Sequence, residues 1–467
     1  MIAAAAPTPT TSVLDSIGNT PMHEVTNIDT GKCRLFLKLE SQNPGGSIKD
    51  RIGLSMIRAA EESGALKPGG TLVEATAGNT GLGLALVAAQ RGYQMVIIVP
   101  DKMAQEKVFH LKALGTKVIT TRSDVGKGHP EYYQDMAERL AAENGWYYVN
   151  QFENAANPKA HYETTGPEIA AQVHASGAGK VDAMICGVGS GGTITGLSHY
   201  FADTNEGTEM VLADPEGSIL THYIDTGVVS DDVGSWLVEG IGEDFLPPIA
   251  DFSHCKTAYT VSDADAFRAG RDLLKAEGIL AGSSSGTLIE AALRYCHAQT
   301  EPKNVVTFVC DRGDKYLSKM YNDHWMADNG FIRPEPTGDL RDLIARKHDE
   351  NQVITLKPDT TLAAAYRQMK LYEISQLPVM TDTGALVGLL DEEDLLMSVY
   401  QAGGSFDGQV ADIMTTQLHT VGPDAKPDDI MPLLSQGMVV PVVEGDRFHG
   451  IITKIDMLNH MRLNGGL

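Results

Sequence analysis

Cysteine is scarce and unpatterned in this sequence, and long apolar runs are missing. The 467 residues include five cysteines, none of them in a CxxC or CxxxC pair, and neither these nor the 14 histidines show metal-ligand spacing. Such an odd set in a long chain favours reduced thiols in a cytosol. No run of about 18 apolar residues occurs, so we expect no transmembrane helix. The cysteine usage predicts a cytoplasmic protein, and the missing ligand spacing predicts no metal site.

Positive charge is also in short supply. The chain carries 61 acidic against 37 basic residues, a formal net charge of −24. A phosphate backbone would be repelled by this balance, which argues against general nucleic-acid binding. The N-terminus has no basic start, and Pro7 and Pro9 break its short apolar run. We therefore expect no signal peptide.

Two sequence patterns follow one another along the chain. Residues 33–320 alternate short β-branched runs, such as Met95–Pro100, with amphipathic stretches, such as Gly81–Arg91. Strand and helix in alternation predict an α/β fold with parallel sheets, and such sheets place ligands at the carboxyl ends of their strands. Glycine and proline then cluster in residues 326–340, which indicates a linker.

An internal repeat follows the linker. VITLKPDTTL at 353–362 matches LHTVGPDAKP at 418–427, and each copy reads strand, helix, strand, strand, helix. The predicted divisions are a large domain at 1–325, a linker at 326–345 and two repeats at 346–400 and 408–467.

Lys49 is the candidate nucleophile. It lies in NPGGSIKDR, after a Pro-Gly-Gly turn and at the start of a helix predicted to continue through Ile57. The positive end of a helix dipole disfavours the ammonium form, and a neutral amine is what a Schiff base requires. A surface lysine paired with Asp50 fits the same stretch.

Three further loops join a predicted strand to a predicted helix. GSGGT at 189–193 offers backbone N–H groups to an anion such as a phosphate monoester, although it lacks the spacing of a Walker or Rossmann loop. TAGNTG at 76–81 offers amides and hydroxyls to a carboxylate. AGSSSG at 281–286 presents a serine that can face a ring nitrogen. Each loop also fits an ordinary capped helix start.

In this order and register the motifs resemble the fold-type II pyridoxal-phosphate family, from about Ser12 to Met326. SIGNTP, EATAGNTG, QFENAANPKAHYETTGPEI and GVGSGGTITG are similar to segments of that family. VEGIGEDF at 238–245 and DRGDKYLSKMYND at 311–323, with the appended repeat, resemble cystathionine β-synthases and their tandem CBS-domain (Bateman) module. The implied fold is α/β, with two α/β subdomains of parallel-rich sheets and a C-terminal CBS module.

The resemblance implies a role for each matching residue. Lys49 would bind pyridoxal 5′-phosphate covalently and later move the Cα proton of the substrate. The other cofactor-binding residues would be Asn79 at the ring oxygen, Gly189, Ser190, Gly191, Gly192 and Thr193 around the phosphate, and Ser284 at the ring nitrogen, the last good to one position because Ser283 and Ser285 flank it. Substrate-binding residues would be Thr76, Ala77, Gly78, Asn79, Thr80, Gln151 and Glu243.

Two of these residues, Ala77 and Glu243, depart from the family pattern, which often has serine at the first position and, in the animal enzymes, tyrosine at the second. Haem is not expected, because the 15 residues before SIGNTP contain neither cysteine nor histidine.

The implied reaction joins L-serine to L-homocysteine, giving L-cystathionine and water. A serine at the ring nitrogen leaves the cofactor a weaker electron sink than an aspartate would, so transamination is disfavoured and β-replacement survives. One alternative is a cysteine synthase or a sulfide-releasing cysteine lyase that uses O-acetylserine or cysteine. Another is a sensor of adenosyl ligands with a dead catalytic domain.

In the repeats, Thr453 and Asp456 form a hydroxyl-x-x-carboxylate pattern that such modules use for ribose, with Gln376 as a possible neighbour. The first copy has Asp391 and Asp394 at the matching places, so the second cleft is the better effector site. By resemblance the effector would be S-adenosylmethionine. A module that only sets assembly is the alternative. The family also implies a homodimer or a larger homo-oligomer.

Overall fold

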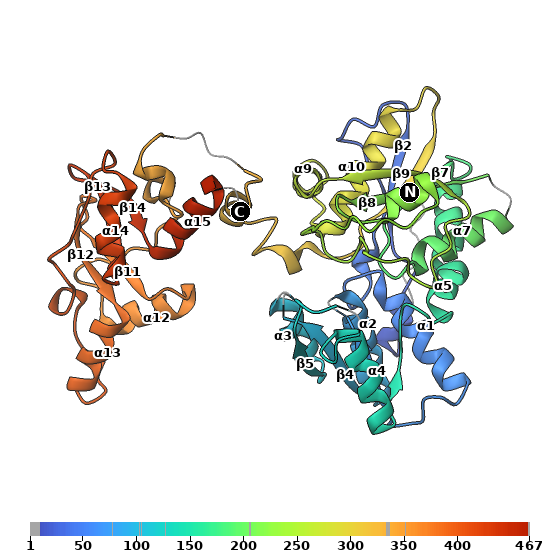
Figure 1. The fold of residues 1–467 in the computed structure, drawn as a ribbon, viewed down its shortest axis with the longest axis horizontal. Helices are drawn as coiled ribbons and strands as arrows, with labels where there is room; N and C mark the ends of the chain where they lie inside the picture. The colour runs from blue at the N-terminus through green and yellow to red at the C-terminus, as the bar shows by residue number, and fades with distance from the viewer. Residues whose placement is uncertain are drawn as a thin grey trace. The chain divides into compact units, whose positions relative to one another are not determined.

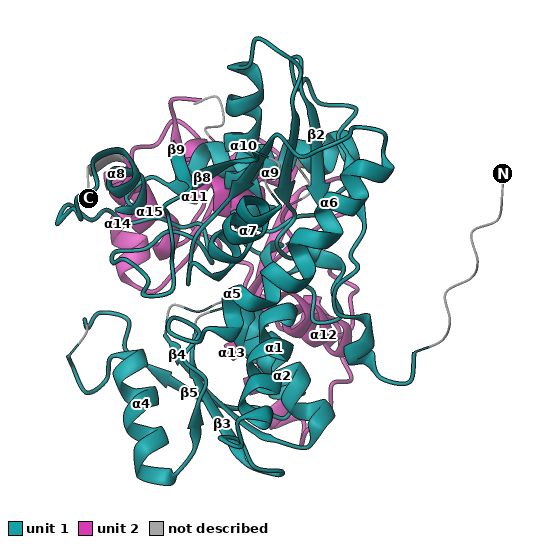
Figure 2. Cartoon of the chain, turned by 90° about the vertical axis from the view of Figure 1, so that its right-hand side faces the viewer, with its two compact units in different colours: residues 1–321 teal, residues 322–467 magenta. Residues whose placement is uncertain are grey.

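A computed structural model describes residues 10–76, 78–101, 103, 105–126, 128–204, 207–332, 337–350 and 352–465. The chain forms two compact units, one ending at Tyr321 and the other beginning at Asn322 (Figures 1 and 2). None of the helices in these ranges is both long and apolar enough to cross a membrane.

The larger sheet of the N-terminal unit has six strands. Their order is β1 (Met22–Glu24), β2 (Arg34–Lys38), β10 (Asn304–Phe308), β7 (Ala183–Cys186), β8 (Glu209–Pro215) and β9 (Cys255–Val261). Only β1 runs antiparallel to its neighbour. Apart from the first residues of β8 and β10, the central strands are buried, as expected when helices cover both faces of a parallel sheet.

The smaller sheet is wholly parallel. Its order is β5 (Lys117–Thr121), β4 (Gln94–Pro100), β3 (Thr71–Ala75) and β6 (Tyr147–Tyr148). Alternate residues of β4 enter two different cores: Ile97 packs with α1 and α2, whereas Ile98 packs with α4. Burial on both faces explains the unbroken apolar run MVIIVP. The predicted α/β class with parallel-rich sheets is confirmed.

Helices connect the parallel strands and cover both sheets (Figure 1). They are α1 (Lys49–Glu62), α2 (Asn79–Arg91), α3 (Gln105–Ala113), α4 (Tyr133–Asn144), α5 (Ala156–Ala160), α6 (Gly166–Ala175), α7 (Gly192–Asp203), α8 (Leu220–Thr226), α9 (Asp263–Glu277) and α10 (Ser283–His297). A π-helical turn, His161–Thr165, joins α5 to α6.

Two glycines let α1 and α2 cross with their backbones in contact. A Cβ on Gly83 would lie 2.6 Å from the carbonyl oxygen of Lys49, and one on Gly53 would lie 2.7 Å from the carbonyl carbon of Gly83. Since no real side chain tolerates such distances, both positions require glycine. The crossing holds the first turn of α1, with Lys49, against the start of α2.

The C-terminal unit contains the two repeats. Its strands pair antiparallel as β11 (Gln376–Met380) with β12 (Leu386–Asp391) and β13 (Val440–Glu444) with β14 (Arg447–Ile452). Its helices are α11 (Asp323–Asp328), α12 (Leu362–Tyr372), α13 (Glu392–Gln401), α14 (Pro427–Ser435) and α15 (Lys454–Gly465). In each repeat a parallel bridge, Leu356 to Val379 or Val421 to Val442, supplies the first strand position.

Each repeat has its own apolar core, and each core includes residues outside the bounds predicted for that repeat. Leu340, Leu343 and Ile344, which fall in the predicted linker, pack in the core of the second repeat. Val410, which falls in the predicted second repeat, packs in the core of the first. The core of the second repeat therefore combines residues 340–344 with residues from 421 onward, whereas the core of the first repeat comes from the continuous stretch 354–414.

Candidate active site

The carboxyl ends of the parallel strands bring the predicted loops together. β3 leads through residues 76–78 into α2, and β7 leads through residues 187–191 into α7. α10 begins at Ser283, and an antiparallel bridge joins Ala281 to Arg312, just beyond β10. Parallel sheets commonly bind ligands at this edge.

Lys49 is the first residue of α1 and is half-buried. Burial lowers the pKa of its amino group, and the nearby groups of Cys310, Glu243 and Asp311 oppose that shift. Asp50, named in the surface ion-pair alternative, is fully buried and accepts a hydrogen bond from the backbone N–H of Gly45 at 2.5 Å. A lysine with a lowered pKa in this setting has the properties of a nucleophile and proton carrier.

The loop before α7 forms a cradle that only glycines fit. A Cβ on Gly192 would lie 1.9 Å from Oδ1 of Asn157, and one on Gly191 would lie 2.5 Å from the Cβ of Ala250. A Cβ on Gly189 would lie 2.8 Å from the carbonyl oxygen of Gly240. The loop ends at the N-terminus of a twelve-residue helix, where unpaired backbone N–H groups favour an anion. These residues fit a phosphate group.

The side chains of Asn157 and His161 contact the residues of the cradle. Asn157 donates one hydrogen bond to the hydroxyl of Ser190 and another to the carbonyl of Gln151, both at 2.9 Å. The hydroxyl of Thr193 lies 3.2 Å from Nε2 of His161. Burial, with the charge of Lys49, holds the pKa of His161 well below its usual range, so this imidazole stays neutral. Neither Asn157 nor His161 was identified from the sequence; their only signal is a shared position in QFENAANPKAHYETTG.

The loop after β3 places its polar groups as a carboxylate site would need. The hydroxyl of Thr76 accepts from the backbone N–H of Gly78 at 3.1 Å, and Thr80 donates to Oε1 of Gln151 at 2.7 Å. The side chain of Gln151 also hydrogen-bonds to Glu74. Burial raises the pKa of Glu74, beneath the loop, to about 8. Ala77 lies outside the described residues.

The three serines at the start of α10 differ in what they bind. Ser283 accepts from the N–H of Glu239 at 3.0 Å, and Ser285 accepts from the N–H of Cys310 at 2.9 Å. Ser284 makes neither of these structural bonds, is 5% exposed, and faces the thiol of Cys310. Because Ser283 and Ser285 are used in backbone hydrogen bonds, Ser284 is the better candidate to bind a ligand.

Two further residues near the site, Asp311 and Lys315, were not identified from the sequence. Asn79 donates to Oδ2 of Asp311 at 2.8 Å and accepts from Nζ of Lys315 at 2.8 Å. Both partners lie in DRGDKY, a motif that the sequence singled out only as a family signature. Glu243, across the site, has its pKa raised well above the usual value by burial and by Asp244 and Asp214.

In the C-terminal unit, the structure joins two of the three predicted effector residues. Oδ2 of Asp456 accepts from the N–H of Thr453 at 2.7 Å and from its hydroxyl at 2.5 Å. Gln376 begins β11 in the other repeat, where it pairs with Asp391. In the first copy, Asp391 caps α13 by accepting from the N–H of Asp394 at 2.7 Å.

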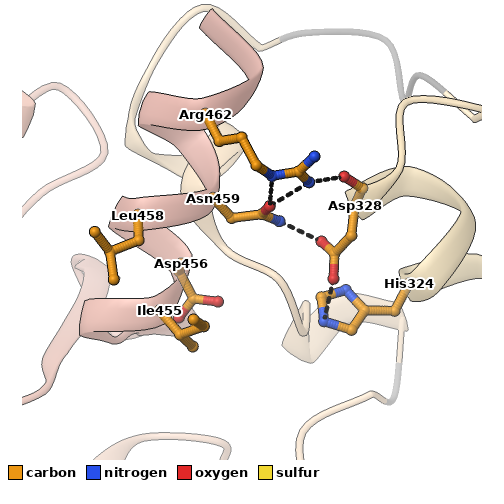
Figure 3. Close-up of a pocket in the computed structure, with 7 residues that line it drawn as sticks. All are labelled: His324, Asp328, Ile455, Asp456, Leu458, Asn459 and Arg462. Atoms are coloured by element: carbon orange, nitrogen blue, oxygen red, sulfur yellow. Dashed lines mark hydrogen bonds and ion pairs between the residues drawn. The ribbon is translucent and has the colours of Figure 1, made fainter. Parts of the chain in front are cut away.

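A pocket of about 350 Å³ lies beside Asp456, between α11 and α15 (Figure 3). Asn459 and Arg462 of α15 point toward Asp328 of α11. Asn459 donates to Oδ1 of Asp328 at 2.5 Å, and Arg462 donates to its backbone carbonyl. Helix α11 thus forms one wall next to the predicted effector pair.

Comparison with known proteins identifies the class first. Residues 13–311 match the family model described as pyridoxal-phosphate dependent enzyme, and residues 341–400 and 410–463 match the CBS domain model. The chain is therefore a pyridoxal-phosphate-dependent enzyme with a pair of CBS domains.

The relatives narrow this class. The chain is 35% identical over 469 residues to cystathionine beta-synthase of Dictyostelium discoideum, covering 96% of this chain and 92% of that one. It is 39% identical over 311 residues to the O-acetylserine dependent cystathionine beta-synthase of Bacillus subtilis, covering 66% of this chain and 96% of the relative. The crystal structure of a hydrogen sulfide-producing enzyme from Fusobacterium nucleatum matches with a TM-score of 0.61 and 36% identity, over 66% of this chain and 100% of the other.

This chain belongs to the cystathionine β-synthase family, and its activity is of the transsulfuration type. The predictions of the family, of the fold-type II catalytic fold with tandem CBS domains and of an enzyme are confirmed. The hypothesis of a sensor with a dead catalytic domain was wrong.

Proposed function

We propose that this enzyme condenses L-serine with L-homocysteine to give L-cystathionine and water. The observation that carries the proposal is the setting of Lys49, whose amino pKa is lowered by burial and which lies near Glu243 and Asp311. Around it converge the glycine cradle, the Thr76–Thr80 loop and the serines of α10. These groups would suit a phosphate, a carboxylate and a ring nitrogen.

Pyridoxal phosphate, when bound, withdraws electrons from the Cα of the substrate. Lys49 would hold it covalently, and Asn79 and Ser284 would bind its ring. Its phosphate would rest on five residues of the cradle, namely Gly189, Ser190, Gly191, Gly192 and Thr193. At three of these positions an added Cβ would collide with neighbouring protein atoms, so glycine lets the loop pack closely, and its end at the N-terminus of α7 favours an anion.

The chain's own groups then account for the proton transfers. Lys49 Nζ takes the Cα proton and, as an ammonium group, gives a proton to the hydroxyl that leaves Cβ as water. The thiol sulfur of homocysteine would then bond to Cβ as its S–H bond breaks, and Lys49 Nζ would take that proton and return one to Cα. Thr76, Gly78, Thr80 and Gln151, with Ala77, would hold the substrate carboxylate throughout, and Glu243 would contact the second substrate.

A second donor is supported by specific relatives. The Bacillus enzyme is named as O-acetylserine dependent, and the Fusobacterium enzyme is titled as producing hydrogen sulfide. The same lysine and cradle would serve O-acetylserine, whose acetate leaves without the proton that hydroxide needs. The alternative activity is therefore cysteine or cystathionine synthesis from O-acetylserine, or release of sulfide from cysteine.

The deciding experiment compares kcat/KM for serine and O-acetylserine, each with homocysteine and with sulfide as acceptors. We expect cystathionine from serine and homocysteine to form with the highest kcat/KM. A preference for O-acetylserine or sulfide would retain the fold and the cofactor but replace the reaction.

We further propose that the C-terminal unit binds an adenosyl effector, S-adenosylmethionine, through Thr453, Asp456 and Gln376, and that the enzyme is a cytoplasmic homodimer or larger homo-oligomer. Support comes from the paired Thr453 and Asp456 and from the CBS domain match. Isothermal titration with S-adenosylmethionine tests the ligand. Heat release with wild type supports it, whereas none leaves the unit with a role in assembly, which sedimentation would measure.

A further inference from the structure

The amide of Asn79 is held from both ends by charged side chains that come from one short segment. Its nitrogen lies 2.8 Å from Oδ2 of Asp311, and its oxygen lies 2.8 Å from Nζ of Lys315. Asp311 is fully buried and Lys315 is 8% exposed. Hydrogen bonds to charged groups in such surroundings are stronger than those between neutral groups.

The chemistry of these partners leaves the amide a single orientation. An ammonium group can only donate and a carboxylate can only accept, so Lys315 must face the amide oxygen and Asp311 the amide nitrogen. Tyr316 also donates to Oδ2 of Asp311, at 2.9 Å, and burial holds its pKa well above the usual value, so its hydroxyl remains a donor. The amide of Asn79 keeps one N–H that neither partner uses.

The same segment also touches the other loops of the site. Nζ of Lys315 lies 3.4 Å from the carbonyl oxygen of Gly46, in the turn that leads to Lys49. A Cβ on Gly282, at the start of α10, would lie 1.9 Å from Oδ1 of Asp311. The buried Oδ1 has no hydrogen-bond partner among the described residues. Asp311 and Lys315 thus stand where the lysine turn, the Asn79 loop and the serine loop meet.

We propose that Asp311 and Lys315 are positioning residues, which fix the amide of Asn79 so that its remaining N–H faces the ring oxygen of the cofactor. The proposal rests on the assignment of Asn79 as a cofactor-binding residue. A ring oxygen that carries negative charge needs a donor, and an inverted amide would present its own oxygen instead. Lys315 and Asp311 exclude that inverted state without touching the cofactor themselves.

The test is a double-mutant cycle on cofactor binding. Asp311→Asn and Lys315→Met keep the side-chain size but no longer dictate the amide orientation, and Asn79→Ala removes the amide. The affinity of each apoenzyme for pyridoxal phosphate is measured by fluorescence titration. We expect Asp311→Asn and Lys315→Met each to weaken binding by about tenfold to a hundredfold, the usual loss for a hydrogen bond to a charged group. In the Asn79→Ala background the same changes should cost less than about twofold.

A spectroscopic readout separates positioning from mere stability. A donor to the ring oxygen favours its ionised form, so the pH midpoint of the visible absorption change should rise in Asp311→Asn and Lys315→Met. Glu209→Gln is the matched control. Glu209 likewise accepts from a tyrosine and a lysine, Tyr295 at 2.6 Å and Lys303 at 3.4 Å, but it begins β8 at the opposite edge of the sheet. It should leave both readouts unchanged.

Two results would overturn the proposal. Equal losses with and without Asn79 would show that Asp311 and Lys315 act independently of the amide. An unchanged absorption midpoint would show that the ring oxygen does not sense them. Should Asp311→Asn fail to fold, the Lys315→Met cycle decides alone. A wild-type protein that binds no pyridoxal phosphate would instead overturn the cofactor assignment itself, which is a distinguishable failure.

Discussion

The N-terminal and C-terminal units hold their candidate ligand groups in different ways. Beside the cofactor site, Asp311, Asn157 and Asp50 are buried, and each has an oxygen with no hydrogen-bond partner among the described residues. In the C-terminal unit, by contrast, the half-buried carboxylate of Asp456 is satisfied by Thr453 in the manner of a helix cap. Buried polar groups are costly, so a site full of them points to a ligand more strongly than a satisfied cap does.

Replacing Lys49 tests the stronger side of this comparison and has the largest expected effect. Lys49→Ala removes both the covalent attachment and the proton carrier, so cystathionine formation should fall by at least about a thousandfold. Steady-state assays of the cofactor-loaded protein measure the loss. Lys159→Ala, an exposed lysine of α5, serves as the control and should retain full activity. Activity that survived in Lys49→Ala would refute the role of this lysine.

Filling the glycine cradle tests whether its geometry is needed for phosphate. In Gly192→Ala the new methyl would meet Oδ1 of Asn157, and overpacking of this kind costs about 1–3 kcal/mol. We expect affinity for pyridoxal phosphate to drop by about tenfold or more, as measured by equilibrium dialysis. Gly126→Ala is the matched control, because a Cβ there meets nothing within 4 Å. Equal affinity in the two variants would contradict the cradle.

The sequence predicts those parts of the fold that leave a local pattern. The run MVIIVP predicted β4 to within one residue, because burial on both faces leaves an unbroken apolar signal. The predicted helix at Gly81–Arg91 begins two residues earlier, at Asn79, because the glycine and asparagine of the loop disguise its first turn. The glycine loops could be located because strand-to-helix turns leave a local pattern, whereas the roles of Lys49 and Ser284 stay predictions from the family resemblance.

Other features have no local pattern. Asn157, His161 and Lys315 meet the site only through tertiary packing, across 33, 32 and 236 residues from Ser190, Thr193 and Asn79 respectively. The packing of Leu340 with Ile430 and Val440 in the core of the second repeat is equally hidden. Periodicity identifies elements, whereas contacts between distant elements need the fold itself.

The buried acid beneath the substrate loop should make the stability of the N-terminal unit depend on pH. Burial raises the pKa of Glu74 from 4.5 to about 8, so the folded state keeps this proton while the unfolded state releases it. The contribution is fully present below pH 4.5 and is lost as pH rises toward 8, at up to about 1.4 kcal/mol per pH unit. Urea unfolding across this range should show a shallower decline in Glu74→Gln, which cannot ionise. An identical slope would mean that Glu74 ionises freely in the folded protein.

The smallest effect is expected for Asp456 in the C-terminal unit. This variant tests directly whether a carboxylate that already caps a helix also binds a ligand. Asp456→Asn keeps the size of the cap but removes the charge that would bind a ribose hydroxyl, so affinity for S-adenosylmethionine should fall several-fold, by about 1 kcal/mol. Asp394→Asn, the matching position of the first repeat, should leave the affinity unchanged in isothermal titration. If both variants weaken binding equally, the two clefts are equivalent. If neither does, Asp456 is only a helix cap, and the effector of this unit is bound elsewhere.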